Sequence, residues 1–210
     1  MIDFKRFFIL CAIVIIFAGT CQAEEAITET TKETAAVEPA QEKPHSLKGI
    51  EFLTGFGVAR IREKGSYHVT PFLIDLDFDL KPLTKKIGIN PSIMIQGIIE
   101  PFASYVSEPD NNAEIGNNFL IKIGFLPESS KVQPYFKGGV GVVYITQHTR
   151  EQGTQFNFNE YAGIGMHYFF KKNIALTAEF RWRHLSNAGI DSPNSGINTN
   201  YGICGISYLF

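Results

Sequence analysis

Residues 72–80 read FLIDLDFDL, and this stretch decides the fold class. Large apolar residues occupy every even position from Phe72 to Leu80, whereas aspartates occupy positions 75, 77 and 79. Successive side chains of a β-strand point to opposite faces, so the alternation predicts a strand with one apolar and one acidic face. A half-buried strand of a soluble protein can show this pattern once, but here it recurs along most of the chain.

The same period of two predicts eight strands in all. Their predicted ranges are 48–61, 67–80, 91–104, 113–126, 133–147, 155–170, 173–186 and 196–210. Tight connections at 127–130 and 171–173 carry turn residues, and longer polar connections occupy 107–112 and 187–195. Short turns at one end and longer loops at the other are typical of an outer-membrane barrel with both termini in the periplasm.

Charge decides which face of the predicted strands meets lipid. In 173–186, Phe180 and Trp182 alternate with Arg181 and Arg183. A Lys or Arg on the lipid face costs about 2–4 kcal/mol at the membrane midplane, so the charged set should point inward. The predicted inward set holds both signs in similar number: Glu51, Asp75, Asp77, Asp79, Glu100, Glu179, Lys122, Lys137, Arg181 and Arg183. An eight-stranded barrel is just wide enough for side chains to fill it, which favours a paired polar plug over a substrate channel.

Composition agrees with this all-β prediction of an eight-stranded antiparallel transmembrane β-barrel. The net charge is −2, so no basic surface indicates a nucleic-acid partner. After the N-terminus no stretch reaches the ~18 consecutive apolar residues of a membrane-spanning helix, but an alternating barrel has an average hydropathy like that of a soluble protein. A soluble β-sandwich is an alternative fold, although the charged side chains would then lie in its interior and would be hard to pair.

The first 23 residues are typical of a secretory signal peptide. Lys5 and Arg6 form its positive end, residues 7–18 form a short apolar core, and small residues allow cleavage after Ala23. A lipoprotein variant cleaved before Cys21 is an alternative that the preceding threonine disfavours. Export through an N-terminal signal peptide agrees with the outer membrane of a Gram-negative bacterium as the destination.

Three parts of the chain follow from these patterns. Residues 1–23 are the signal peptide, residues 24–46 are a disordered periplasmic leader, and residues 47–210 form the barrel. The leader is rich in Glu, Thr, Ala, Lys and Pro and has no aromatic residue, so it cannot bury a core. Cys204 alone survives in the mature chain, which predicts neither an internal disulfide nor a Cys/His zinc site. A lone thiol is safest facing lipid.

A histidine and a serine follow Trp182 on the outward face of 173–186. Alternation places His184 and Ser186 side by side, with Cβ atoms about 6–7 Å apart, so their side chains can reach a hydrogen bond. An imidazole beside a hydroxyl is the start of a nucleophile–base pair. His, Trp and Ser are also tolerated in the interfacial belt of a barrel, so the spacing alone leaves both interpretations open.

Residues 183–196, RHLSNAGIDSPNSG, resemble the signature of PagL-type lipid A 3-O-deacylases. In that family a strand ends in H-x-S-N-A, and a loop with Pro-Asn and Gly precedes the last strand. The matching positions are His184, Ser186, Asn187, Ala188, Gly189, Pro193, Asn194 and Gly196. The terminal Phe210, with Tyr208 and Ile206 on its face, is similar to the sorting signal of bacterial outer-membrane barrels.

The resemblance implies an outer-membrane serine esterase that hydrolyses the 3-O-linked hydroxyacyl ester of lipid A and so modifies lipopolysaccharide. Ser186 would be the nucleophile and His184 the base, while Asn187, Asn194 and Gly189 would serve the oxyanion and the substrate. The scheme needs no cofactor and no metal ion. Its partners are lipid A and outer-membrane lipids, and a homodimer that buries the outward site is compatible with the sequence.

One position departs from the family pattern. The family's third triad member is a Glu two residues after the glycine that corresponds to Gly196, and here that position is Asn198. Asn orients an imidazole but cannot stabilise its charged form, and loss of such a carboxylate can cost ~10⁴ in rate. Closing the hairpin so that Phe170 pairs with Ile174 puts Glu160 opposite the histidine. The hypothesis is that Glu160 replaces the missing acid.

Alternatives remain for each of these assignments. Glu160 is also tolerated in the headgroup belt, and a one-residue bulge would turn it inward. Asp191 is within reach from the loop, but no spacing favours it. Trp182 and Phe180 are expected to border the acyl chain. The competing function is a non-catalytic structural barrel that retains a decayed deacylase site. Asn198 favours this alternative, and the presence together of His184, Ser186, Asn187 and Asn194 disfavours it.

Overall fold

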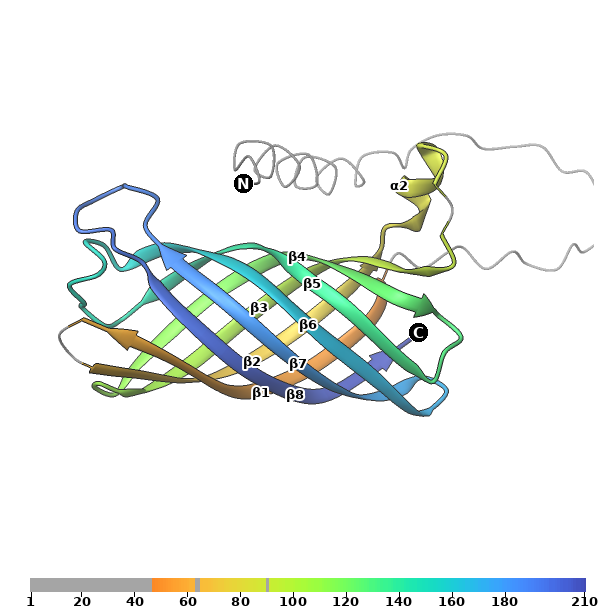
Figure 1. Cartoon of the computed structure of the whole chain (residues 1–210), viewed down its shortest axis with the longest axis horizontal. Coiled ribbons are helices and arrows are strands. Elements are labelled where there is room, and N and C mark those ends of the chain that lie inside the picture. The colour runs from red at the N-terminus through yellow and green to blue at the C-terminus, as the bar shows by residue number, and fades with distance from the viewer. Residues whose placement is uncertain (1–46, 63–64, 90) are drawn as a thin grey trace, which may run out of the picture. The chain divides into compact units, whose positions relative to one another are not determined.

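The computed structural model describes residues 47–62, 65–89 and 91–210, and the predicted signal peptide and leader lie outside them. Each of eight antiparallel strands pairs with the next, and the last pairs with the first, so the sheet closes into a barrel (Figure 1). The strands are β1 Leu47–Ile61, β2 Gly65–Asp79, β3 Ile93–Glu108, β4 Asn112–Pro127, β5 Val132–Ile145, β6 Phe156–Lys171, β7 Ile174–Ser186 and β8 Ile197–Leu209. The predicted fold class is confirmed, and β3 extends furthest beyond its predicted end.

The longest connection lies at the end of the barrel where β1 begins and β8 ends (Figure 1). It joins β2 to β3 and contains the helix α2, Lys81–Lys86. The expectation of short turns at this end was wrong for this connection, because Pro82 fits the first helical turn and starts a helix instead of a tight turn. No helix of the described residues has the length and apolar character of a membrane span.

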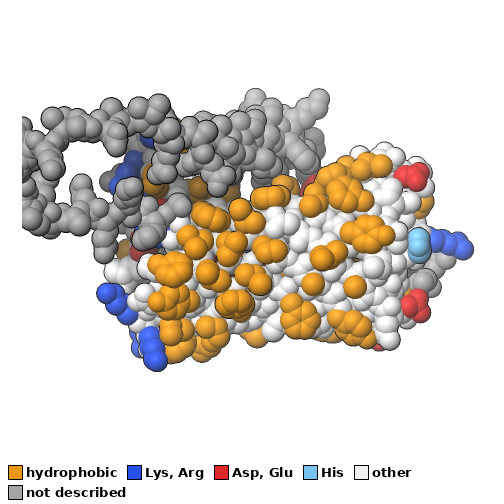
Figure 2. Space-filling view, turned by 180° about the vertical axis from the view of Figure 1, so that it is seen from behind, with side chains coloured by type: hydrophobic (Ala, Val, Ile, Leu, Met, Phe, Trp, Pro, Cys, Tyr) orange, Lys and Arg blue, Asp and Glu red, His pale blue; other side chains and the backbone are white. Residues whose placement is uncertain are grey.

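The outer wall of the barrel is apolar, as Figure 2 shows for one side. Phe72 and Ile74 of β2 are exposed on it, whereas Asp75 and Asp77, which follow them on the opposite face of the strand, are fully buried inside. The predicted alternation is therefore confirmed, and the apolar wall is the surface that meets lipid. Cys204 is exposed on this wall, as expected for a lone thiol.

The inward charges are paired within the barrel. Each buried lysine or arginine of the predicted inward set contacts at least one buried carboxylate. The pairs are Lys122–Glu51, Lys122–Asp77, Lys137–Asp75, Lys137–Glu100, Lys137–Glu179, Arg181–Glu100, Arg181–Glu179 and Arg183–Glu114. Glu114 was missing from the prediction. Asp79 differs from the predicted set, because it is only half-buried at the end of β2, where its Oδ1 accepts a hydrogen bond from the Lys81 N–H.

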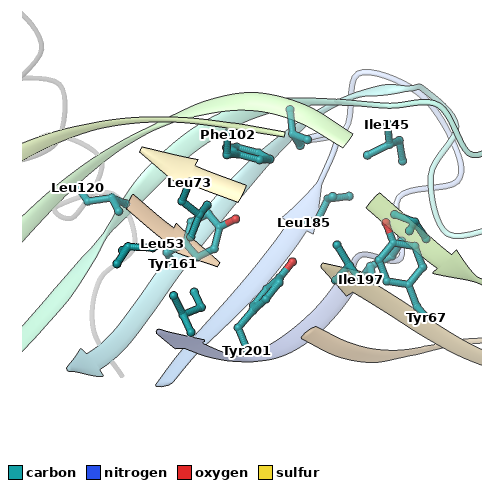
Figure 3. Packing of buried hydrophobic residues seen from close by; sticks show 14 of the residues in the cluster. Leu53, Tyr67, Leu73, Phe102, Leu120, Ile145, Tyr161, Leu185, Ile197 and Tyr201 are labelled. Carbon is teal, nitrogen blue, oxygen red and sulfur yellow. The ribbon is translucent and has the colours of Figure 1, made fainter. Parts of the chain in front are cut away.

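Part of the interior is apolar rather than ionic, which the predicted polar plug did not include. An apolar cluster draws side chains from all eight strands (Figure 3). Leu185 of β7 and Ile197 of β8 belong to it, are almost fully buried, and lie opposite each other across the ladder. Because these two side chains are anchored inside, their chain neighbours His184, Ser186 and Asn198 must face the outer wall.

Candidate active site

The candidate site lies where β7 ends and β8 begins, at the end of the barrel opposite α2. His184 and Ser186 are half-buried on the outer wall, and the residues between and beyond them, Leu185 and Asn187, are buried. The loop 187–196 then connects the two strands. The predicted placement of the histidine and the serine on one outward face is confirmed.

The imidazole of His184 is held from three directions. Its Nδ1 lies 2.7 Å from Oδ1 of Asn198, its partner across the ladder. The Trp182 ring stacks on it, with centroids 6.1 Å apart and planes inclined by 19°. An added Cβ at Gly196, whose φ is +76°, would lie 3.0 Å from Nε2 and closer still to Cε1, so only glycine fits there.

This geometry fixes the proton of His184. A carbonyl oxygen only accepts hydrogen bonds, so Nδ1 carries the hydrogen in its bond to Asn198. Nε2 then keeps its lone pair and is free to accept a proton. This is the tautomer that a general base next to a hydroxyl nucleophile requires.

Ser186 is the remaining polar side chain of this outward face of β7. Its partner across the ladder is Phe158, and within the described part of the chain its hydroxyl makes no hydrogen bond to His184. Hydrogen bonds between catalytic groups are often long before substrate binds and shorten in the complex. Parity and a two-residue spacing therefore place the serine on the same outward face of β7 as His184.

Glu160 lies opposite His184 in the β6–β7 ladder, as predicted. The predicted pairing of Phe170 with Ile174 was wrong in detail, because a register shift at the turn pairs Ile174 with Lys171. The shift ends before the site, so the register there is unchanged. Glu160 is half-buried, and it forms no hydrogen bond or ion pair among the described residues.

The loop 187–196 is organised around the side chain of Asn187. Its Oδ1 accepts from the Gly189 N–H at 2.9 Å, and its Nδ2 donates to the carbonyl oxygens of Asp191 and Pro193 at 2.9 and 3.2 Å. The Asn187 N–H donates to Oδ1 of Asn194 at 2.9 Å. Asn187 is therefore buried and fully occupied in shaping the loop, whereas the exposed Asn194 keeps its Nδ2 without a partner in the described chain.

A second loop supports the first, and no spacing pattern in the sequence indicates this contact. The β5–β6 connection runs beside residues 193–195 through the Gln152–Asn194 bridge, the Gly153 N–H to Pro193 O bond and the Ser195 N–H to Glu151 O bond. The approach is so close that an added Cβ at Gly153 would lie 2.6 Å from the Ser192 carbonyl oxygen. The loop that carries Asn194 is thus held in place by another loop.

The described residues also contain a cluster of carboxylates inside the barrel. Glu51, Asp75 and Asp77 each offer an oxygen within 4.8 Å of the others. The ammonium groups of Lys122 and Lys137 contact all three carboxylates. These lysines supply the positive charge that a cation would bring, so the cluster belongs to the ion-pair network of the interior.

Comparisons with known proteins place this geometry in a family. The family model for lipid A 3-O-deacylase (PagL) matches residues 75–206. No curated protein sequence matches the chain. A crystal structure of the outer membrane enzyme PagL matches with a TM-score of 0.54 and 16% identity, covering 75% of this chain and 99% of that one. A crystal structure of Neisserial surface protein A matches with a TM-score of 0.55 and 12% identity, covering 77% and 96%.

These two structural matches show the shared fold alone, because a surface protein has the same barrel as an enzyme. The family is shown by the sequence match, which covers more than half of the chain and includes His184, Ser186 and Asn198. The chain is therefore a β-barrel of the Gram-negative outer membrane that belongs to the lipid A 3-O-deacylase (PagL) family.

Proposed function

We propose that this protein is a serine esterase that hydrolyses the 3-O-linked hydroxyacyl ester of lipid A. The observation that carries the proposal is the 2.7 Å hydrogen bond between His184 Nδ1 and Asn198 Oδ1. It leaves Nε2 as a base on the face that also carries Ser186. The site opens on the lipid-facing wall, so a membrane lipid reaches it laterally, without leaving the bilayer.

The reaction would proceed in two halves. Ser186 Oγ attacks the ester carbonyl carbon while His184 Nε2 takes the hydroxyl proton, and collapse of the tetrahedral intermediate returns that proton to the departing sugar oxygen. The products of this half are the 3-hydroxyl of lipid A and an acyl-serine. Water, deprotonated by the same imidazole, then hydrolyses the acyl-serine and releases the 3-hydroxy fatty acid.

Two residues divide the task of the missing family glutamate. Asn198 orients the imidazole and fixes its tautomer, but an amide carries no charge with which to stabilise the imidazolium. Glu160 lies across the ladder from His184 on the other side, and we assign to it the electrostatic part of the task. A carboxylate at a half-buried position beside lipid acts through a lower dielectric than water and so acts more strongly.

The oxyanion requires donors that are not already used. Asn194 Nδ2 has no partner in the described chain, and the same holds for the N–H of Ala188. We therefore assign the oxyanion to these two groups and a supporting role in the loop to Asn187 and Gly189. Trp182 and Phe180, which are 39% and 54% exposed on the wall below the site, would border the acyl chain.

Mass spectrometry of lipid A tests the activity. Lipid A from cells that express the wild type should lose one 3-hydroxyacyl group, and fragment masses should place the loss at the 3-O position. The Ser186→Ala variant should leave lipid A intact, because the nucleophile is gone. Ser195→Ala is the matched control, since Ser195 is an exposed serine of the neighbouring loop and should remain active.

The second candidate function is a structural barrel with a decayed site, which Asn198 in place of glutamate favours. Identical lipid A from the wild type and the Ser186→Ala variant would support this candidate and reject the esterase. The serine mechanism has its own test, which is labelling of the detergent-solubilised barrel by a fluorophosphonate. Labelling should fall on Ser186 and should be lost in His184→Ala, because the hydroxyl then has no base.

A further inference from the structure

Lysines gather at the end of the barrel where β1 begins and β8 ends. Those without an ion pair in the described chain define a lysine collar, whose members are Lys48, Lys85, Lys86, Lys131, Lys171 and Lys172. Lys81 lies at the same end and pairs with Glu128 at 2.6 Å. Among the residues that the structure describes, Asp79 is the other carboxylate side chain at this end, so the described part of this rim carries a positive excess.

The collar adjoins aromatic side chains of the outer wall. Lys131 lies over the Tyr168 ring, 5.1 Å from its centroid. Phe125, Phe170 and Tyr208 are each about half exposed nearby on strand ends of the same rim. Aromatic rings concentrate at the level of lipid headgroups, so the lysines beside them lie at that level too.

The helix α2 extends the collar beyond the barrel wall. Lys85 and Lys86 occupy its last turn. Leu83, Ile87 and Ile89 are 42%, 72% and 52% exposed in and just after it. Exposed apolar side chains next to basic ones are the pattern of a segment that lies in a membrane interface.

The opposite end of the barrel has a mixed charge. Its described basic residues are Arg60, Arg62 and Arg150, and its described acidic residues include Glu108, Asp110 and Asp191. Figure 2 shows both signs at that end, and a group of lysine or arginine side chains at the lower edge of the other end. The positive excess is therefore a property of one rim and not of the whole protein, whose net charge is −2.

We propose that the lysine collar binds the headgroups of anionic phospholipids in the leaflet at the α2 end, with α2 lying in that interface. The bilayer surrounds the barrel. Lipid headgroups at this rim can therefore contact all of the separate turns that carry these lysines. Each lysine near a membrane surface strengthens binding to anionic lipid roughly fivefold. This surface is independent of the esterase chemistry at the opposite rim.

Native mass spectrometry of the full-length protein tests the collar. The barrel is released from micelles that contain phosphatidylglycerol and phosphatidylcholine, and the ratio of the two lipids retained is measured. The wild type should retain phosphatidylglycerol preferentially, and added salt should weaken the preference. Lys171→Gln/Lys172→Gln and Lys85→Gln/Lys86→Gln should each lower it by roughly fivefold for each lysine removed.

Two controls of matched design accompany these variants. Arg60→Gln/Arg62→Gln removes two exposed cations from the opposite rim and should leave the preference unchanged. Ser186→Ala should also leave it unchanged, which separates the collar from the catalytic proposal. The gel mobility shift of a folded barrel checks each variant, and the two lysine pairs lie in different turns, so one pair remains informative where the other fails to fold.

Three results would overturn the proposal. The first is equal retention of the two lipids by the wild type. The second is an equal loss of preference in the arginine pair and the lysine pairs. The third is a preference that exists only after residues 24–46 are deleted, because this acidic segment of the chain would then be the occupant of the collar.

Discussion

The two faces of β7 differ in how their polar groups are satisfied. On the inward face, the Arg183 guanidinium is buried and makes two bonds to the Glu114 carboxylate, at 2.7 and 3.0 Å. On the outward face, the next residue, His184, has one hydrogen bond and leaves its second nitrogen free. The two adjacent residues thus differ in use. The charge of Arg183 is paired with Glu114 inside the barrel, whereas Nε2 of His184 on the outer wall has no partner among the described residues and is available for the role that we propose.

Breaking the inward pair should have the largest effect on stability. Arg183→Met leaves the Glu114 carboxylate buried without its cation, with the Tyr67 hydroxyl still donating a hydrogen bond to it, and should lower the free energy of unfolding by about 3–5 kcal/mol. Urea unfolding in lipid vesicles measures this loss. The double variant Arg183→Met/Glu114→Gln should recover part of it, because no uncompensated charge remains. Little deacylase activity per folded barrel should be lost, and a large loss would contradict the separation of the two faces.

A change on the outward face should instead lower the activity strongly and leave the stability of the barrel almost unchanged. Gly196→Ala places a methyl group against the His184 ring and should lower lipid A deacylation by about 10²-fold through misplacement of the base, with the barrel still folded. Gly202→Ala is the matched control on the same strand, because open space surrounds its Cβ position. Equal activity in the two variants would show that the position of the ring does not matter.

The division of the triad acid's role between Asn198 and Glu160 that we propose predicts a smaller effect on activity. Glu160→Gln should lower the rate about tenfold, which corresponds to about 1.4 kcal/mol of transition-state stabilisation. Asn198→Glu should then raise the rate more in the Glu160→Gln background than in the wild type, since the two carboxylates supply the same charge. The deacylation rates of the wild type, the two single variants and the double variant give the coupling energy between positions 160 and 198. Unchanged activity in Glu160→Gln would remove this residue from the mechanism.

The smallest effect on stability and activity is expected for a residue of the lipid-facing wall that lies away from both the Arg183–Glu114 pair and the His184 site. Cys204→Ala should change the free energy of unfolding by less than about 0.5 kcal/mol, because its side chain is exposed and carries no disulfide. Deacylation should match that of the wild type. A clear loss of either quantity would show that the wall around Cys204 has a role that its exposure does not indicate.

Much of the site was predictable because strand geometry is periodic. Parity alone placed His184, Ser186 and Asn198 on one outward face, and counting back from the hairpin placed Glu160 opposite the histidine. The predicted pairing of Glu160 with His184 is confirmed although the predicted pairing at the turn was wrong, because the register shift near Ile174 ends before the site. Local alternation and hairpin register are short-range properties, which is why a sequence can report them.

Other features depend on contacts between distant parts of the chain. Glu114 and Arg183 are separated by 69 positions, and only barrel closure shows that they pair. The same is true of Gly153 against Ser192, a contact between two loops with no periodic pattern. The full use of Asn187 in its own loop also required the folded loop, because a motif names a residue type and not its hydrogen-bond partners.

The sequence by itself determined the barrel, the direction of each strand's faces and the placement of His184 and Ser186 on one outward face, because side chains alternate wherever a strand forms. Only the tertiary structure decided that Asn198 holds Nδ1 of His184, that a second loop supports Asn194, and that lysines from separate turns share one rim. These depend on distances across the closed sheet, and a linear sequence does not encode such distances in any periodic form.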